Sequence, residues 1–348
     1  MARGPFLSTT ATFNQSSLIE SAKDTGHYPA KEDRSETPIT SLRDLEYRLG
    51  EDRETLRLLA KNWRTEYSPF QQTKPAKPFQ REVKTGKVRN IDNPSKELKR
   101  VQKKILNRLL RPVKLPHFLF GAVSKCSVNA HAAEHLLHGS ECVVKLDVKS
   151  YYPNVTNRHV YFVWEQILHC SPAIARLLTQ LTTYDWHLPQ GSPTSPALAN
   201  IFLASIYGPV LDECSEKNIT ATAWVDDLIF SGEEARSVME LARQALAANG
   251  FKLSSKKRVI LNGHDSKVIT GVRLGNKKIR VPNDKLSDIR AAIHKLEIGC
   301  IADYQRENYI ASLNGRLNNI ERICAQDARP LKQRMISALS LSKSQCGR

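Results

Sequence analysis

The sequence predicts an α+β fold in which a mainly antiparallel sheet is backed by helices. The first observation is a set of short apolar runs of strand length, separated early in the chain by stretches with helical spacing of apolar residues. The second is that helical spacing continues after Pro282 almost to the end of the chain. The expected strands lie at 141–148, within 222–231, at 258–262, 267–274 and 277–281, and the expected intervening helices at 156–181, 195–215 and 233–249.

The N-terminal third has its own pattern. Residues 1–40 are polar and without periodicity, which predicts a loose tail. Two helices should follow, with a break near Gly50 and with Asp52 as the cap of the second. Residues 68–94 contain prolines and a Thr-Gly pair, which indicate a hairpin or loop. Residues 95–113 then predict an amphipathic helix with one apolar stripe and a basic remainder.

The charge of the chain indicates its class of partner. The 348 residues carry a formal net charge of +17. Residues 74–114 alone hold 14 Lys and Arg against three acids. Such a surplus predicts a polyanion, and nucleic acid is the expected one. On the helix at 95–113, basic side chains that include Lys99 and Lys103 should contact phosphates, although a merely solvated basic helix is the alternative.

Other features of the sequence argue against a membrane protein, a secreted protein and a zinc-binding protein. No apolar run has the length of a membrane span, and the N-terminus lacks a signal-peptide pattern, so a cytoplasmic protein is expected. The seven cysteines are scattered without zinc-ligand spacing, which favours free thiols in a reducing compartment.

Three carboxylates occupy positions that otherwise favour apolar residues. Asp226 and Asp227 separate two strand-like runs, which places the pair at the tip of a tight hairpin. Asp147 ends another apolar strand. Ionised carboxylates beside apolar strands are costly unless cations compensate them. Three of them at neighbouring strand ends suit two Mg²⁺ ions about 3.5–4 Å apart, as in phosphoryl transfer; three unrelated turn aspartates are the alternative.

Residues 188–203, "LPQGSPTSPALANIFL", combine a stiff Pro/Gly turn with an apolar helix that begins near Ser195. Backbone N–H groups at such a helix entry suit an anion or a base-paired template. Taken alone, a turn of this kind is usually structural.

The ordered set "KLDVKSYYPNV", "LPQGSPTSPALAN" and "WVDDLIFSG" resembles the palm of a bacterial reverse transcriptase. Similar segments extend the resemblance over roughly residues 41–320. It implies a right-hand polymerase fold made of fingers, a palm with an antiparallel sheet, and a helical thumb. The implied domains are N-terminal helices and fingers at 41–116, a palm at 117–281 with a fingers insertion at about 154–188, and a thumb at 282–348.

Within this family the chain most resembles the retron-type enzymes, through "ITGV" and "LNGRLNNI". The resemblance implies an RNA-directed DNA polymerase that uses dNTPs and copies a structured non-coding RNA, which is expected to be both template and primer. The DNA product is then a branched RNA–DNA hybrid (msDNA) that serves anti-phage defence with a separate effector protein. Trp224, Val225 and "NAHAAEH" depart from the retron pattern. A non-retron defence enzyme making untemplated or protein-primed DNA, and a catalytically idle RNA-binding scaffold, are the alternatives.

The resemblance also implies roles for single residues. Asp147, Asp226 and Asp227 would hold two Mg²⁺ ions, for which Mn²⁺ is a possible substitute, and the carbonyl of Val148 would complete one metal shell. Lys87 and Arg89 are the implied residues for the triphosphate, with Lys84 as a further candidate. Tyr152 would exclude a 2′-hydroxyl, and Gln190 would line the nucleotide site. Lys256 would act on the leaving pyrophosphate. The implied template and primer contacts are Gly191, Ser192, Trp224, Lys99, Lys103 and the thumb residues Arg316, Arg290 and Lys295. Tyr151 is expected to pack in the core.

Overall fold

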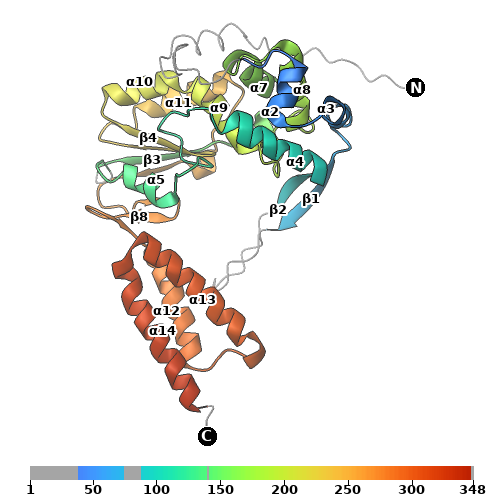
Figure 1. The fold of residues 1–348 in the computed structure, drawn as a ribbon. Helices are drawn as coiled ribbons and strands as arrows, with labels where there is room; N and C mark the ends of the chain where they lie inside the picture. The colour runs from blue at the N-terminus through green and yellow to red at the C-terminus, as the bar shows by residue number, and fades with distance from the viewer. Residues whose placement is uncertain (1–37, 74–87, 139–140, 346–348) are drawn as a thin grey trace.

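The computed structural model describes residues 38–73, 88–138 and 141–345 (Figure 1). Three antiparallel sheets and the helices around them make up this part of the chain, which confirms the predicted α+β class. Residues 1–37 of the expected tail at 1–40, together with Lys84 and Lys87, lie outside the described residues, whereas Ile39 at the end of that tail is buried in the core. No helix in the described ranges is both long and apolar enough to cross a membrane. The described cysteines are free thiols, as expected.

Helices α2 (Leu42–Leu49) and α3 (Arg53–Lys61) form where the apolar spacing predicts them. Gly50 ends α2 with a φ of 53°, a left-handed conformation that glycine adopts without a Cβ clash. Asp52 caps α3, because its Oδ1 accepts a hydrogen bond from the backbone N–H of Thr55 at 2.8 Å. The predicted break and cap are therefore confirmed.

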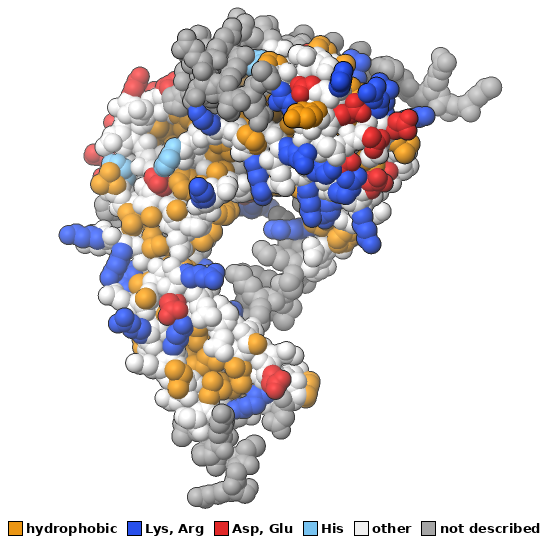
Figure 2. Space-filling view, in the orientation of Figure 1, with side chains coloured by type: hydrophobic (Ala, Val, Ile, Leu, Met, Phe, Trp, Pro, Cys, Tyr) orange, Lys and Arg blue, Asp and Glu red, His pale blue; other side chains and the backbone are white. Residues whose placement is uncertain are grey.

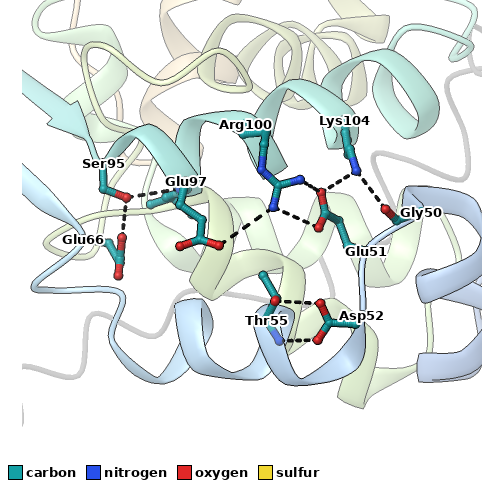
Figure 3. A network of polar contacts seen from close by, with 10 residues as sticks. Gly50, Glu51, Asp52, Thr55, Glu66, Ser95, Glu97, Arg100 and Lys104 are labelled. Atoms are coloured by element: carbon teal, nitrogen blue, oxygen red, sulfur yellow. Dashed lines mark hydrogen bonds and ion pairs between the residues drawn. The ribbon is translucent and has the colours of Figure 1, made fainter.

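The corner between α2 and α3 is attached to α4 (Lys96–Ile105) through charged side chains (Figure 3). Arg100 donates to both carboxylate oxygens of the buried Glu51. Lys104 pairs with the same carboxylate and donates to the carbonyl of Gly50 at 2.8 Å. Arg100 and Lys104 therefore stabilise the contact between α4 and the α2–α3 corner. Part of the basic surface that was expected to contact phosphates is thus paired with an acid of the protein itself.

Strands β1 (Tyr67–Thr73) and β2 (Val88–Pro94) pair in antiparallel register over their full length, which confirms the predicted hairpin. We call these two described strands the arm. Ser95 caps α4 directly after β2, since its Oγ accepts a hydrogen bond from the N–H of Leu98 at 3.1 Å. The arm and the basic helix α4 therefore meet at one short corner.

The central sheet has four antiparallel strands in the order β4–β5–β3–β6. In chain order they are β3 (Val143–Asp147), β4 (Thr220–Trp224), β5 (Asp227–Ser231) and β6 (Val259–Leu261). The two central strands, β3 and β5, are short and almost wholly buried, as expected for the middle of a covered sheet.

Helices cover one face of this sheet, namely α9 (Ser195–Ile206), α10 (Gly208–Glu216) and α11 (Val238–Ala248) (Figure 1). Alternate side chains of β3 and β5 join the main core with these helices. Val143 and Ile229 point to the other face and join a second core, which continues into the C-terminal helices. The sheet thus separates two hydrophobic cores.

Helices α7 (Asn157–Phe162) and α8 (Pro172–Thr182) occupy the region 156–181, where a helical pattern was predicted. The two are separate because the π-helical turn Val163–Ile167 that follows α7 ends at Leu168, His169 has a φ of 54°, and Ser171 is extended before Pro172 begins α8. The end of α8 packs beside α4, where Gln102 donates to the carbonyl of Leu181 at 2.9 Å. This segment therefore joins the N-terminal helices.

A small sheet links the central sheet to a bundle of three helices that projects away from it (Figure 1). The last of these helices, α14, begins at Ala325. Its first turn is fixed by Asp327, which accepts hydrogen bonds from Arg280 at 2.9 Å and from the N–H of Val281 at 3.2 Å. The elements are β7 (Val268–Ile269), β8 (Val272–Leu274), β9 (Ile279–Arg280), α12 (Asn283–Glu297), α13 (Asp303–Ile323) and α14 (Ala325–Gln345).

The Glu51 network yields a stability prediction. Burial alone would raise the pKa of Glu51, but the hydrogen bonds from Arg100 and Lys104 outweigh it and the pKa is lowered. We expect Glu51→Gln to lower the free energy of unfolding by about 1–3 kcal/mol at neutral pH, because charge-assisted bonds are lost. Urea unfolding of the variant and the parent measures the difference.

The pH dependence of that difference has a definite sign. Because the pKa is lowered in the folded state, the stabilisation is present above the unfolded value and is lost as pH falls through the folded value. Glu97→Gln is the control, since Glu97 is exposed and lies 3.9 Å from Arg100, and it should change stability by less than about 0.5 kcal/mol. Equal effects of the two variants would contradict the assignment.

Candidate active site

The β4–β5 hairpin closes through a two-residue turn formed by Val225 and Asp226, because Trp224 pairs with Asp227. The sequence places both aspartates at the tip, whereas in the structure Asp227 is already the first residue of β5. Val225 has a φ of 60°, which a β-branched residue rarely adopts. A positive φ at the first turn position is typical of hairpin turns that match the twist of their strands. The strain is therefore located at the tip of the hairpin.

A segment around Gly121 supports this turn from the side. The N–H of Phe120 donates to the carbonyl of Ala223 at 2.9 Å, and Asn200 donates to the carbonyl of Gly121 at 2.8 Å. A Cβ atom at Gly121 would lie 2.4 Å from the backbone nitrogen of Val225. Only glycine permits this approach, so the backbone of the segment packs directly against the strained turn.

The structure brings the three predicted aspartates to one end of the sheet. Asp147, the last residue of β3, pairs in register with Asp227. The N–H of Val148 donates to the carbonyl of Asp226 at 2.9 Å, which ties the turn to the end of β3. Burial raises the pKa of Asp226, and Asp147 raises it further. Burial also raises the pKa of Asp227, and the Asp226 and Asp147 charges add to that effect.

One cation faces this group from the segment after α11. Lys257 donates from Nζ to Oδ1 of Asp147, and this bond raises the pKa of the lysine. The segment is aligned by backbone bonds, including Ser254 N–H to the carbonyl of Asp147 at 2.8 Å. Lys256, the residue chosen from the sequence, has no hydrogen bond or ion pair to another described side chain. The pattern "SSKK" offers two adjacent lysines, and only the local 3₁₀ turn decides which one points inward.

The chemistry of this donor set fits a hard divalent cation. Asp226 and Asp227 receive no side-chain hydrogen bond or ion pair from the described residues, and burial, followed by the neighbouring carboxylates, keeps the pKa of both raised although Lys257 acts to lower it. Within the same residues, no three His, Cys, Asp or Glu side chains stand close enough to form a ready-made metal cage. Mg²⁺ is commonly held by one or two carboxylates together with substrate phosphates and waters, and does not require such a cage. Aspartate oxygens are its preferred ligands.

Two further predicted residues approach the carboxylates. The positive charge of Arg89, on the exposed part of β2, acts to lower the pKa of Asp226. Tyr152 lies on the short helix α6 (Tyr151–Asn154), and burial and then the Asp226 charge raise its pKa to about 12. Tyr151 is buried and donates to the carbonyl of Ala199 at 2.8 Å, which confirms the expected core packing.

The turn at 188–194 is joined to the arm. The N–H of Asp92 in β2 donates to the carbonyl of Gln190 at 2.8 Å, and the N–H of Gln190 donates back to the Asp92 carboxylate at 3.1 Å. Gly191 is exposed, and a Cβ atom there would lie 2.7 Å from the carbonyl oxygen of Asp92. Ser192, by contrast, is buried and bonded to Thr194 at 2.9 Å, which leaves it little access to a template.

The remaining predicted contacts are distributed over the molecule. Trp224 stacks on His131, with ring centroids 5.4 Å apart, so its ring packs against the protein. Lys99 and Lys103 lie on α4 without an ion pair to another described residue, and Lys103 is exposed. Arg316 lies on α13 in the helical bundle, where its charge acts on Tyr309. Trp224 lies beside the carboxylates, since it pairs with Asp227 across the hairpin, whereas Lys99, Lys103 and Arg316 lie on helices outside the sheet.

Sequence reasoning missed a buried polar network beneath the hairpin. His131 and His135, on α5 (Val128–Glu134) and just after it, both bond to Oγ1 of Thr222 at 2.7 Å. His135 also bonds to Ser231 at 2.7 Å. Burial lowers the pKa of His131 to about 4 and that of His135 to about 3, so both are neutral at physiological pH. The only available signal was the i,i+4 spacing of the two histidines.

Comparisons with known proteins agree with this geometry. The family described as reverse transcriptase (RNA-dependent DNA polymerase) matches residues 74–281, which is more than half of the chain. The chain is 27% identical over 217 residues to the Retron Ec86 reverse transcriptase of Escherichia coli, covering 61% of this chain and 67% of that protein. It is 26% identical over 239 residues to the Retron Se72 reverse transcriptase of Salmonella heidelberg, covering 66% and 60%. The Retron Mx65 reverse transcriptase of Myxococcus xanthus is 27% identical over 232 residues, covering 61% and 54%. The matches thus span between about half and two thirds of these relatives.

Proposed function

Because this chain belongs to the reverse transcriptase (RNA-dependent DNA polymerase) family, we propose that it copies RNA into DNA at Asp147, Asp226 and Asp227. The observation that carries the proposal is the register of β3 and β5, which sets Asp147 opposite Asp227 at the end of the sheet. Reverse transcriptases use divalent metal ions. Mg²⁺, or Mn²⁺ in its place, would be held by these aspartates and the carbonyl of Val148, and would supply Lewis-acid activation of the primer hydroxyl and of the phosphoryl group.

The protein groups around the aspartates support nucleotide binding. Arg89 already exerts its charge on Asp226, so it is suited to bind the triphosphate that reaches the same place. Tyr152 is half-buried near Asp226, which supports its role against a 2′-hydroxyl and hence a preference for dNTPs. Gln190 is held to β2 through Asp92, which supports a place in the wall of the nucleotide site. Lys87 remains a second candidate for the triphosphate.

For the leaving pyrophosphate we propose Lys257 in place of Lys256. Lys257 is the lysine that reaches the carboxylate of Asp147, and a bound metal ion would compete with it for that oxygen. The released ammonium group is then positioned to donate a proton or a charge-assisted hydrogen bond to the pyrophosphate. Lys256 has no hydrogen bond or ion pair to another described side chain.

The fold supports the proposed domains of a right-hand polymerase. The central sheet belongs to the palm at 117–281, and α12–α14 form the thumb at 282–348. The insertion at about 154–188 packs beside α4, which supports grouping it with the fingers at 41–116. Figure 2 shows Lys and Arg side chains gathered over α4 and the arm beside it. Lys99, Lys103, Gly191 and Arg316 are the proposed template and primer contacts.

We propose the retron type within the family, because the relatives reported above are retron reverse transcriptases. The chain would then copy a structured non-coding RNA, which is also its primer, into a branched RNA–DNA hybrid (msDNA). The product would serve anti-phage defence in the cytoplasm together with a separate effector protein. Trp224 does not weaken this proposal, since its ring packs on His131 and leaves the carboxylates unchanged.

The first prediction tests polymerase activity. Asp226→Asn should lower the incorporation of labelled dNTPs on an RNA template by at least about 100-fold, because a charge required for cation binding is removed. Glu233→Gln is the matched control, an exposed carboxylate just beyond β5, and should leave incorporation unchanged. Incorporation that survives Asp226→Asn would exclude the proposed function and favour an RNA-binding scaffold.

The second prediction separates the two adjacent lysines. We expect Lys257→Ala to lower the single-turnover rate of incorporation by about 100-fold, because the group that assists the leaving pyrophosphate is lost. Lys256→Ala should change the rate by less than about threefold, since no contact of that side chain is lost. The reverse order of sensitivity would restore Lys256 as the functional residue.

The third prediction concerns the retron type. Nucleic acid that co-purifies with the protein from its native host should contain a branched RNA–DNA hybrid with one fixed template sequence. Sequencing of the RNA and DNA strands, before and after debranching, measures this directly. Homopolymeric DNA or DNA linked to protein would instead identify a non-retron defence enzyme.

A further inference from the structure

A cavity of about 500 Å³ lies on the outer side of α7 and α8, away from the aspartates. Its walls combine aromatic rings with amide and guanidinium groups, a composition found in sites for flat polar ligands. Its size also falls within the range of small-molecule sites. The residues on which the argument depends are Arg158, Tyr161, Gln166, Arg176, Gln180 and Trp186.

Trp186 is held at the edge of the cavity in a strained conformation. Tyr184 and His187 exchange backbone hydrogen bonds of 2.9 and 3.0 Å, so Asp185 and Trp186 form a two-residue hairpin turn. Both turn residues have positive φ, 43° and 66°, where glycine or asparagine is the usual choice. The Trp186 side chain is nevertheless 56% exposed. A largely exposed indole held in a conformation that costs energy leaves an aromatic surface open to a ligand.

The surrounding residues hold the Trp186 indole in place, and Arg64 brings a positive charge beside it. The N–H of Asn157 donates to the carbonyl of Trp186 at 2.9 Å, which ties the turn to the start of α7. Trp63 meets the indole edge-on, with ring centroids 5.4 Å apart. The guanidinium of Arg64 lies 4.6 Å from the Trp63 ring and 5.3 Å from the Trp186 ring. The indole is thus pre-oriented before any ligand arrives.

The charged groups of the cavity favour an anionic ligand. Arg158 and Arg176 are exposed and form no ion pair with another described residue. Glu165 is the one acid among the lining residues, and it already accepts hydrogen bonds from Tyr161 at 2.8 Å and Gln166 at 3.1 Å. The positive charge is therefore left for a partner, as expected for phosphate binding.

We propose that this cavity binds an unpaired nucleotide of single-stranded RNA, with the base stacked on Trp186 and the phosphates paired with Arg158 and Arg176. The inference rests on the proposed function for the presence of RNA, but it concerns a site separate from the aspartates. Aromatic stacking accepts any base, and the amides of Gln166 and Gln180 can donate to or accept from a base edge.

The test measures the affinity of the full chain for a fluorescein-labelled, unstructured RNA oligonucleotide by anisotropy at several salt concentrations. Trp186→Gly should weaken binding about 5- to 100-fold, because the stacking surface is lost. Glycine accepts the positive φ, so this variant should keep its thermal unfolding temperature. Trp186→Phe should retain most of the affinity. Tyr47→Ala is the control, an aromatic side chain 86% exposed on α2 and outside the cavity.

A second arm tests the arginines and the strandedness of the RNA. Arg158→Ala together with Arg176→Ala should reduce the slope of log affinity against log salt by about 0.7 per lost phosphate contact, whereas Arg57→Ala, an exposed arginine on α3, should leave it unchanged. A blunt RNA duplex should bind all variants equally.

Single-strand affinity unchanged in Trp186→Gly, or an equal loss for the duplex, would overturn the inference. Neither result depends on dNTP incorporation, so it leaves the test of the proposed function at Asp226 unaffected.

Discussion

The antiparallel pairing of β3 with β5 is the interaction on which the candidate active site depends. Backbone hydrogen bonds fix the register, and the register decides which side chains share the end of the sheet. Because side chains alternate along a strand, a slip of one residue would send Asp147 and Asp227 to opposite faces. The bond from Val148 to Asp226 extends the pairing into the turn, so all three aspartates are placed by the main chain.

Main-chain hydrogen bonds and close backbone contacts between distant segments also position the groups around the aspartates. The arm that carries Arg89 is bonded through Asp92 to the turn that carries Gln190. The glycine at 121 lets a separate segment pack against the strained turn at Val225. Each of these contacts requires two backbone segments to lie close together. The site is therefore built from several short segments, and the central sheet and its helices keep them in place.

Local patterns in the sequence predicted much of this structure, and long-range contacts account for the rest. The break at Gly50 and the cap at Asp52 were predictable, because both follow from preferences of single residues. The three aspartates were predictable, because charges beside apolar strands are unusual. The choice of Lys257 over its neighbour was not, since it depends on one 3₁₀ turn. The stacking of Trp224 on His131 joins residues 93 positions apart, which no local pattern encodes.

The partial burial of Asp226 and Asp227 has a consequence for the stability of the protein. Burial raises the pKa of both carboxyl groups, and the nearby positive charge of Lys257 offsets only part of that effect, so their ionised forms cost folding free energy. Selection for higher folding stability alone would favour amides or apolar residues at positions 226 and 227. The sheet and its two cores must therefore supply enough stability to tolerate these acids.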